Sequence, residues 1–235
     1  MHKSKKNIDV VLLCGGKGER LRPLTSTIPK PLLLVNNKPF LYYIINNFLG
    51  VGVNHIFLAS GYKSEKVFAF KKKYFKDSKN ITVINSGNVD IIKRLQDCSK
   101  FIKNDFFVCY GDTFIKINLE KHIKDFYNSK ADGVVSSAYY QLKFGTLKLD
   151  KKNKYVTKFQ EKPIIKQPIN LGYFIFKKKT LLMIDKKKSW LSFLNNFTKL
   201  KKLETIITKK EYFTFDSPRD YQEIKTKFIG KSGKN

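Results

Sequence analysis

The sequence is short of arginine and of acidic residues, although it is rich in lysine. Only four of the 47 basic residues are arginine, and 19 acidic residues leave a formal net charge of +28. Proteins that read nucleic acids favour the guanidinium fork of arginine over the ammonium of lysine. We therefore assign the surplus charge to solvated surface lysines and expect no nucleic-acid partner. The alternative, a nucleic-acid-binding protein, predicts binding with a steep salt dependence.

Cysteine and histidine are also scarce, with three residues of each. Their spacing contains no pattern that suits a zinc site, so free buried thiols in a reducing compartment are expected. No apolar run approaches the length of a membrane-spanning helix, and no membrane partner is expected. The apolar residues 10–13 lead directly into a glycine-rich loop without a cleavage site, which indicates a first strand rather than a signal peptide. Together these absences favour a cytoplasmic protein.

What the sequence does contain is enough apolar material for one folded domain. At 235 residues with 42% apolar side chains, the chain can bury a full core. We predict a single domain over residues 1–229 and a disordered tail at 230–235. Expected strands and helices alternate in the first 135 residues, with strands at 10–13, 56–60, 81–84 and 106–110 and helices at 40–49, 65–75, 89–101 and 118–129. This order predicts an α/β, Rossmann-like fold with a mostly parallel sheet and helices on both faces.

Beyond residue 134 the pattern changes to shorter β segments, at 134–140, 146–149, 156–160 and 172–176. We predict that residues 134–176 form a β-rich insertion, which would make a lid or wall beside the carboxyl edge of the sheet. The remaining expected elements are a helix over 190–198, a strand over 212–215 and a last helix from 218 to 228.

One loop carries an unusual concentration of special residues. The stretch LCGGKGERLRPLTSTIPKP, at 13–31, follows the first strand, and its glycines can bring backbone N–H groups close to phosphate oxygens. It has neither the G-K-[ST] of a P-loop nor the third glycine of a dinucleotide-binding loop. Arg20 is nearby in sequence, and Lys30 is framed by Pro29 and Pro31, which restrict where it points. The loop therefore predicts a site for an anionic, phosphate-bearing ligand.

Two aspartates follow expected strands. Asp112 comes after the strand at 106–110, and Asp216 comes after the strand at 212–215. Two carboxylates from different strands can share Mg²⁺ together with substrate phosphates. The alternative is a turn or helix-start role for Asp112 and an N-cap role for Asp216. Because both occur in a chain with the glycine loop and Lys30, we favour the metal role.

Several short motifs follow one another along the chain in a characteristic order. They are G-G-x-G-x-R-L-x-P-L-T, P-K-P, Tyr110-Gly111-Asp112, Phe144-Gly145, Glu161-Lys162-Pro163, Asn170-Leu171-Gly172 and Phe215-Asp216-Ser217-Pro218-Arg219-Asp220-Tyr221. This series, over residues 9–224, resembles that of the sugar-1-phosphate nucleotidyltransferases. The L-C-G-G form of the loop looks most like the heptose- or mannose-1-phosphate guanylyltransferases and the glucose-1-phosphate cytidylyltransferases.

The resemblance implies a reaction in which an NTP and a sugar 1-phosphate give an NDP-sugar and pyrophosphate, with Mg²⁺ as cofactor. The implied catalytic residues are Arg20, Lys30 and Asp112, and the implied metal ligands are Asp112 and Asp216. The implied nucleotide contacts are Leu13, Cys14, Gly15, Gly16, Gly18 and Gly111. The implied acceptor contacts are Gly145, Glu161, Lys162, Asn170 and Gly172. Products of this kind feed surface glycans such as capsule and lipopolysaccharide.

The largest departure from the family lies at residues 85–92, Asn-Ser-Gly-Asn-Val-Asp-Ile-Ile, where relatives commonly carry a glycine-rich turn. Ile91 and Ile92 would project towards the base pocket or into the helix packing beneath it. Base selection is then expected from side chains, with Asn85, Asn88 and Asp90 as candidates. A carboxylate can accept from the N1–H and N2–H edge of guanine, which favours GTP weakly over CTP. A non-catalytic sensor of nucleotide sugars, or a cytidylyltransferase acting on a non-sugar phosphate, is the alternative.

Overall fold

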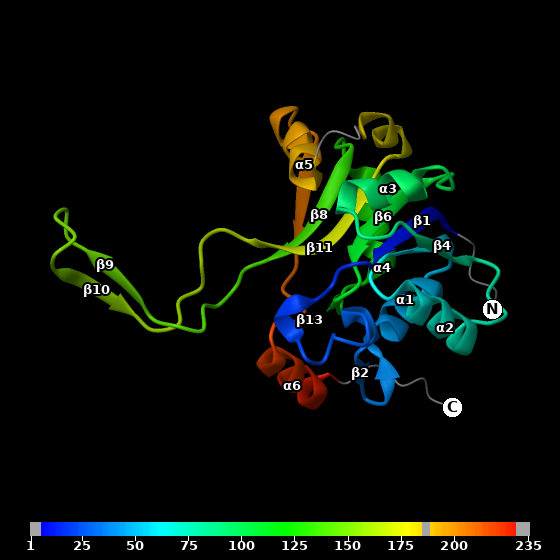
Figure 1. The fold of residues 1–235 in the computed structure, drawn as a ribbon. Coiled ribbons are helices and arrows are strands. Elements are labelled where there is room, and N and C mark those ends of the chain that lie inside the picture. The colour runs from blue at the N-terminus through cyan, green and yellow to red at the C-terminus, as the bar shows by residue number, and fades with distance from the viewer. Residues whose placement is uncertain (1–5, 185–188, 229–235) are drawn as a thin grey trace.

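A seven-stranded sheet forms the centre of the computed structural model, which describes residues 6–184 and 189–228 (Figure 1). The predicted tail at 230–235 lies outside these residues. In spatial order the strands are β12 (Leu203–Ile207), β8 (Gly133–Ala138), β11 (Ile169–Phe176), β6 (Asp105–Tyr110), β1 (Lys6–Leu13), β4 (Val53–Ser60) and β5 (Ile81–Asn85).

Most neighbouring strands in this sheet are parallel. β1 pairs in parallel with β4 on one side and with β6 on the other, β5 continues beyond β4, and β12 is parallel to β8. β11 runs antiparallel to both of its neighbours, β6 and β8. Because the chain order reverses at β1, its carboxyl end is where a ligand crevice is expected in an open α/β sheet. The predicted mostly parallel α/β fold is confirmed.

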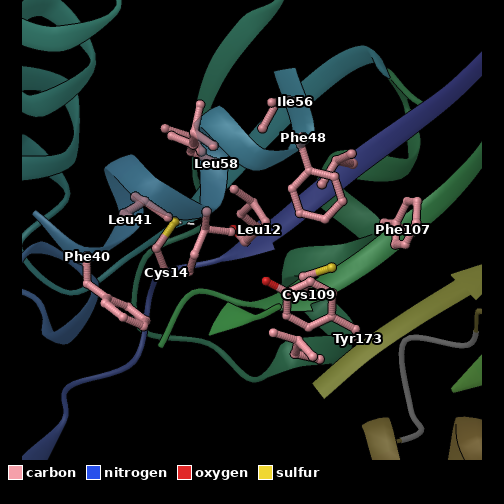
Figure 2. Packing of buried hydrophobic residues seen from close by; sticks show 14 of the residues in the cluster. Leu12, Cys14, Phe40, Leu41, Phe48, Ile56, Leu58, Phe107, Cys109 and Tyr173 are labelled. Atoms are coloured by element: carbon pink, nitrogen blue, oxygen red, sulfur yellow. Dashed lines mark hydrogen bonds between the residues drawn. The ribbon is translucent and has the colours of Figure 1, made fainter. Parts of the chain in front are cut away.

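Helices cover both faces of the sheet because alternate strand side chains point to opposite sides. One core cluster joins Val10 and Leu12 of β1 to α1 (Phe40–Gly50), α2 (Ser64–Tyr74), α4 (Leu119–Asn128) and α6 (Pro218–Lys227). The other cluster joins Val11 to α3 (Ile91–Ser99) and α5 (Trp190–Lys199). Figure 2 shows part of the first cluster, where Leu12 lies among side chains of α1, β4 and β6.

Three two-stranded sheets and three 3-10 turns lie outside the central sheet in the described residues, and two of these sheets belong to the same compact part of the molecule as the central sheet. β2 (Leu34–Val35) pairs with β3 (Lys38–Pro39), and β7 (Thr113–Ile115) pairs with β13 (Tyr212–Thr214). The 3-10 turns span Glu19–Leu21, Lys30–Leu32 and Lys178–Met183. Within the described ranges, 6–184 and 189–228, no helix has the length and apolar character needed to cross a membrane.

The region 134–176 differs from the prediction of one β-rich insertion. β8 and β11 are strands of the central sheet, since the side chains at 173–176 are apolar and buried. Between them, β9 (Thr146–Leu149) and β10 (Val156–Gln160) form an antiparallel hairpin that stands away from the rest of the molecule (Figure 1). The expected wall is therefore corrected to a shorter projection, residues 139–168, which we call the arm. We call the remainder of the described chain the body.

Candidate active site

A short strand pair brings Asp112 and Asp216 together. Asp112 lies between β6 and β7, and Asp216 follows β13 by two residues. β7 and β13 are antiparallel, with Thr113 opposite Thr214 and their hydroxyl oxygens 3.2 Å apart. Residues that are 104 positions apart in sequence are thus held at one end of the same small sheet.

Lys30 occupies the space between these two carboxylates. Its Nζ lies 2.7 Å from Asp112 Oδ2 and 2.6 Å from Asp216 Oδ1. Lys30 is only 8% exposed, and its ammonium lies 5.4 Å from the centre of the Phe215 ring. Arg20 Nη1 approaches the second oxygen of Asp216 at 3.4 Å. The structure therefore brings together all the predicted catalytic and metal-binding side chains.

A cleft of about 500 Å³ opens beside this cluster. Its wall carries three cationic side chains, Lys17, Arg20 and Lys30, against the carboxylates of Glu19 and Asp216, and this surplus favours an anionic ligand. The complete lining is Lys17, Gly18, Glu19, Arg20, Leu21, Lys30, Asn88 and Asp216.

The three predicted glycines of the loop have different roles. An added Cβ at Gly15 would overlap the guanidinium of Arg94, so this position is needed for packing. Gly18 has a φ of +62° and its carbonyl accepts a hydrogen bond from Thr25 Oγ1 at 2.8 Å, so it makes the turn. Gly16 is exposed, with open space around its Cα. Gly16 is therefore the loop glycine most accessible to a ligand.

Leu13 and Gly111 mark the carboxyl ends of β1 and β6. The Gly111 N–H donates to the Leu13 carbonyl at 3.0 Å, and an added Cβ at Gly111 would lie 2.8 Å from that oxygen. Gly111 thus allows the close approach of the two segments that lead to the loop and to Asp112.

The side chain of Cys14 does not face the cleft. It is 1% exposed, its Sγ donates to the Leu12 carbonyl at 3.2 Å, and burial raises the pKa of the thiol well above its ordinary value. Figure 2 shows it among the core side chains. The Cys14 N–H donates to the Ala59 carbonyl at 3.0 Å. The side chain of Cys14 therefore belongs to the core and supports the loop from beneath, and the predicted nucleotide contact of this residue stays a prediction.

Arg94 is the residue that sequence reasoning missed. Its guanidinium donates to the carbonyls of Ser60 at 2.7 Å, Gly15 at 3.0 Å and Val89 at 2.8 Å. Arg94 is 5% exposed, and this burial lowers the pKa of its guanidinium. One side chain thus joins the loops after β1 and β4 to the start of α3. Its signal in the sequence was the scarcity of arginine, which occupies only four of the 47 basic positions.

The polar side chains of the segment 85–92 lie in different surroundings. Asp90 is the N-cap of α3, and its Oδ1 accepts from the Lys93 N–H at 2.9 Å. Asn85 Oδ1 accepts from the Gly87 N–H at 3.0 Å. One oxygen of each side chain thus serves a local cap or turn, and the predicted role of both residues in base reading stays a prediction. Asn88 lines the cleft, and Ile92 is buried in the helix packing.

The predicted acceptor residues fall into two groups. Asn170 and Gly172 begin β11, where Asn170 Oδ1 accepts from the Gly172 N–H at 2.7 Å and Gly172 packs against Tyr110, close to Asp112 in sequence. Gly145, Glu161 and Lys162 lie at the base of the arm hairpin, where Lys162 Nζ is 3.8 Å from Glu161 Oε1. In the described chain, neither Glu161 nor Lys162 pairs with the Lys30 cluster.

The donor set of the cluster suits Mg²⁺. Two carboxylates converge on one cation position, which Lys30 Nζ takes here, and Mg²⁺ is commonly held by one or two carboxylates plus substrate phosphates. Within residues 6–184 and 189–228, no group of three or more His, Cys, Asp or Glu side chains could hold a metal ion. A metal at Asp112 and Asp216 would therefore depend on phosphate or water for its other ligands.

This chain matches a known protein family and several known proteins. The nucleotidyl transferase family model matches residues 9–209. A D-glycero-alpha-D-manno-heptose 1-phosphate guanylyltransferase of Campylobacter jejuni is 30% identical, over 91% of this chain and 97% of that protein. A probable glucose-1-phosphate cytidylyltransferase of Bacillus subtilis is 30% identical, over 75% of this chain and 77% of that protein.

A longer relative and a solved structure also match this chain. The bifunctional protein GlmU of Methanocaldococcus jannaschii is 34% identical over 77% of this chain, which spans only 43% of that protein. The crystal structure of HddC from Yersinia pseudotuberculosis matches with a TM-score of 0.73 at 28% identity, over 94% of this chain and 99% of that one. The chain therefore belongs to the nucleotidyl transferase family and is a sugar-1-phosphate nucleotidyltransferase.

Proposed function

We propose that the protein transfers GMP from GTP to a sugar 1-phosphate, releasing pyrophosphate and forming a GDP-sugar for surface-glycan synthesis. The observation that carries the reaction is the cluster of Lys30, Asp112 and Asp216 beside a cleft of about 500 Å³ whose wall includes Lys17 and Arg20. We also propose a cytoplasmic location, since its three cysteines are free and buried.

In this proposal an oxygen of the acceptor phosphate attacks the α-phosphorus of the triphosphate. The new P–O bond forms as the bond to the leaving pyrophosphate breaks, so the protein acts through positioning and charge. The open backbone at Gly16 and the side chains of Lys17 and Arg20 would hold the triphosphate. Lys30 would supply positive charge where negative charge grows on the α-phosphate and on the leaving group. Lys162 would bind the acceptor phosphate, with Gly145, Glu161, Asn170 and Gly172 around the sugar.

Mg²⁺ would be held by Asp112 and Asp216. When bound, it neutralises charge on the α-phosphate and on the leaving pyrophosphate.

The preference for GTP rests on relatives that match more than nine tenths of this chain. The Campylobacter protein is named a guanylyltransferase, and a structure of HddC is described as complexed with GMP-PN, with a TM-score of 0.69 at 27% identity. Asn88 is the polar side chain from the divergent segment that reaches the cleft. Its amide can donate and accept, so it can pair with the edge of a guanine or of a cytosine, and the preference for GTP comes from the relatives rather than from this side chain.

A pyrophosphate-release assay tests this proposal. Each of the four NTPs is combined with glucose, mannose and D-glycero-α-D-manno-heptose 1-phosphates in the presence of Mg²⁺. We expect turnover with GTP and at least one of these acceptors. Turnover with CTP alone would overturn the assignment of GTP as the substrate. Tight nucleotide binding without pyrophosphate release would favour the nucleotide-sugar sensor.

A further inference from the structure

The carboxylate of Asp220 is placed between the turn that carries Asp216 and the arm. Asp220 lies in the first turn of α6 and forms a capping box with Ser217: its N–H donates to Ser217 Oγ at 3.2 Å, and its Oδ2 accepts from the Ser217 N–H at 3.1 Å. The same Oδ2 receives the Asp216 N–H at 3.4 Å. Asp220 therefore holds the backbone from which the Asp216 side chain reaches the cleft.

The second oxygen of Asp220 binds the arm. Asp220 Oδ1 accepts from Lys143 Nζ at 2.8 Å, and Lys143 lies on the segment that leads from β8 into the hairpin. Two residues after Lys143 the chain reaches Gly145, one of the predicted acceptor contacts. The ion pair thus joins the base of the arm to the helix that positions Asp216.

The base of the arm is internally paired, so its two strands are expected to move together. The Leu142 N–H donates to the Pro163 carbonyl at 3.0 Å, and the Ile165 N–H donates to the Tyr140 carbonyl at 3.0 Å. These bonds connect the Lys143 side of the arm to the side that carries Glu161 and Lys162. A displacement of Lys143 is therefore expected to move the acceptor residues on both sides of the arm, Gly145 as well as Glu161 and Lys162.

A second cleft lies at the same place. Its volume is about 380 Å³, and Tyr140 and Lys143 of the arm face Tyr212, Asp216 and Asp220 of the body across it. Asp216 lines both this cleft and the cleft of the glycine loop. The contact between arm and body is thus made directly beside a residue of the reacting cluster.

We propose that Asp220 is a positioning residue that couples the arm to Asp216 through Lys143. When the ion pair is formed, the arm base and the Asp216 turn are fixed relative to each other, so the acceptor residues and the metal-binding carboxylate keep one geometry. When it is broken, each is free to shift. The inference rests on the proposed function for its kinetic consequence, but the physical link between arm and turn does not.

Exposed ion pairs generally contribute about 0–1 kcal/mol to stability. The side chains of Lys143 and Asp220 are 47% and 25% exposed, so we expect little change in folding when the pair is removed. The effect is expected instead on geometry, because small misplacements of reacting groups can lower a rate by up to ~100-fold. This difference allows the positioning role to be separated from a structural one.

The first test is Lys143→Met, which removes the ion pair and leaves the capping box intact. We expect kcat/KM for the sugar 1-phosphate to fall about tenfold, KM for the NTP to change less than about twofold, and Lys143→Arg to restore most of the loss. Hydrogen exchange at the Leu142 and Ile165 amides should become faster in Lys143→Met. Lys121→Met is the matched control, since it removes an exposed ion pair of 2.7 Å within α4.

The second test is binding of Mn²⁺ alone, measured by electron paramagnetic resonance, in wild type and in Asp220→Asn. The amide can still accept the Ser217 N–H but loses the charge that holds Lys143, so we expect weaker Mn²⁺ binding with unchanged unfolding. Wild-type exchange and kinetics in Lys143→Met, or equal losses in Lys121→Met, would overturn the coupling. If wild type turns over no sugar 1-phosphate while the exchange and Mn²⁺ effects appear, the coupling stands and the proposed function fails.

Discussion

Phe48 of helix α1 and Phe159 of the arm are both phenylalanines, but Phe48 lies in the core and Phe159 lies at the surface. Phe48 is fully buried, packed against Phe107 at a ring distance of 5.1 Å, whereas Phe159 is 62% exposed. Phe144 and Tyr155 of the arm are similarly exposed, at 79% and 63%. The body is stabilised by contacts between segments distant in sequence, and the arm by its local strand pairing. The comparison teaches that a change in the body should affect folding and chemistry, whereas a change in the arm should affect substrate contacts.

The largest expected difference is in stability. Phe48→Ala should lower the free energy of unfolding by about 3–5 kcal/mol, because it leaves a cavity in the core. Phe159→Ala should change it by less than about 0.5 kcal/mol, since water already surrounds most of the ring. Urea unfolding followed by circular dichroism measures both. Equal losses would show that the arm is part of the cooperative core and would break the comparison.

The second-largest effect is expected on catalysis, at a residue of the candidate active site that the core does not need for folding. Lys30→Met should lower kcat by about 100-fold, because a charge that acts on the transition state is removed. KM for the triphosphate should rise less than kcat falls. A pure KM effect would reduce Lys30 to a binding residue, and wild-type kinetics would make it structural. Urea unfolding of the same variant checks that the fold is retained.

A smaller effect is expected from the residue that joins the loops of the body. Arg94→Lys should lower the free energy of unfolding by about 2 kcal/mol, because a lysine ammonium cannot satisfy the same set of buried carbonyls. Activity should fall with it, as the glycine loop loses its support. Arg219→Lys is the matched control, since Arg219 is 83% exposed and pairs only with Glu223 among described residues. Equal effects in the two variants would remove the special role of Arg94.

The smallest expected effect is a pH dependence that arises in the body. Burial lowers the pKa of His122 to about 4, and its Nε2 lies 2.7 Å from Ser136 Oγ. The unfolded chain therefore binds the proton more readily between pH 6.5 and 4, so stability falls as the pH falls through this range. We expect a loss of about 1 kcal/mol between pH 6.5 and 5.5. His122→Gln should flatten this part of the profile, and an unchanged slope would assign it to other groups.

The elements of the body were predictable where buried residues formed clear patterns. The strands β1, β4 and β6 each contain a buried, mostly apolar run, and their parallel pairing follows from the alternation with helices. β12 was missed because it is an edge strand with several exposed side chains, so its sequence carries no strong apolar signal. The assignment of β8 and β11 to the central sheet was missed because pairing partners distant in sequence cannot be read from local periodicity.

The site was predictable to the extent that chemistry required rare arrangements. Lys30 between two prolines and two aspartates after strands indicated the cluster that the structure shows. The local roles of Asp90 and Asn85 were not predicted, because a search for ligand contacts does not weigh hydrogen bonds to nearby backbone N–H groups. Arg94 was missed because its partners are carbonyls, which every residue has and no sequence pattern marks. The functional roles of the acceptor residues stay predictions.

The buried guanidinium of Arg94 also places a constraint on the gene. The arginine codons AGA and AGG each become a lysine codon by one guanine-to-adenine change, and this chain retains arginine at only four of its 47 basic positions. On the surface such a change preserves charge and solvation. At codon 94 it would replace a planar fork bound to Gly15, Ser60 and Val89 by a single ammonium. A change that is expected to be nearly silent at an exposed arginine such as Arg219 is therefore expected to be damaging at codon 94.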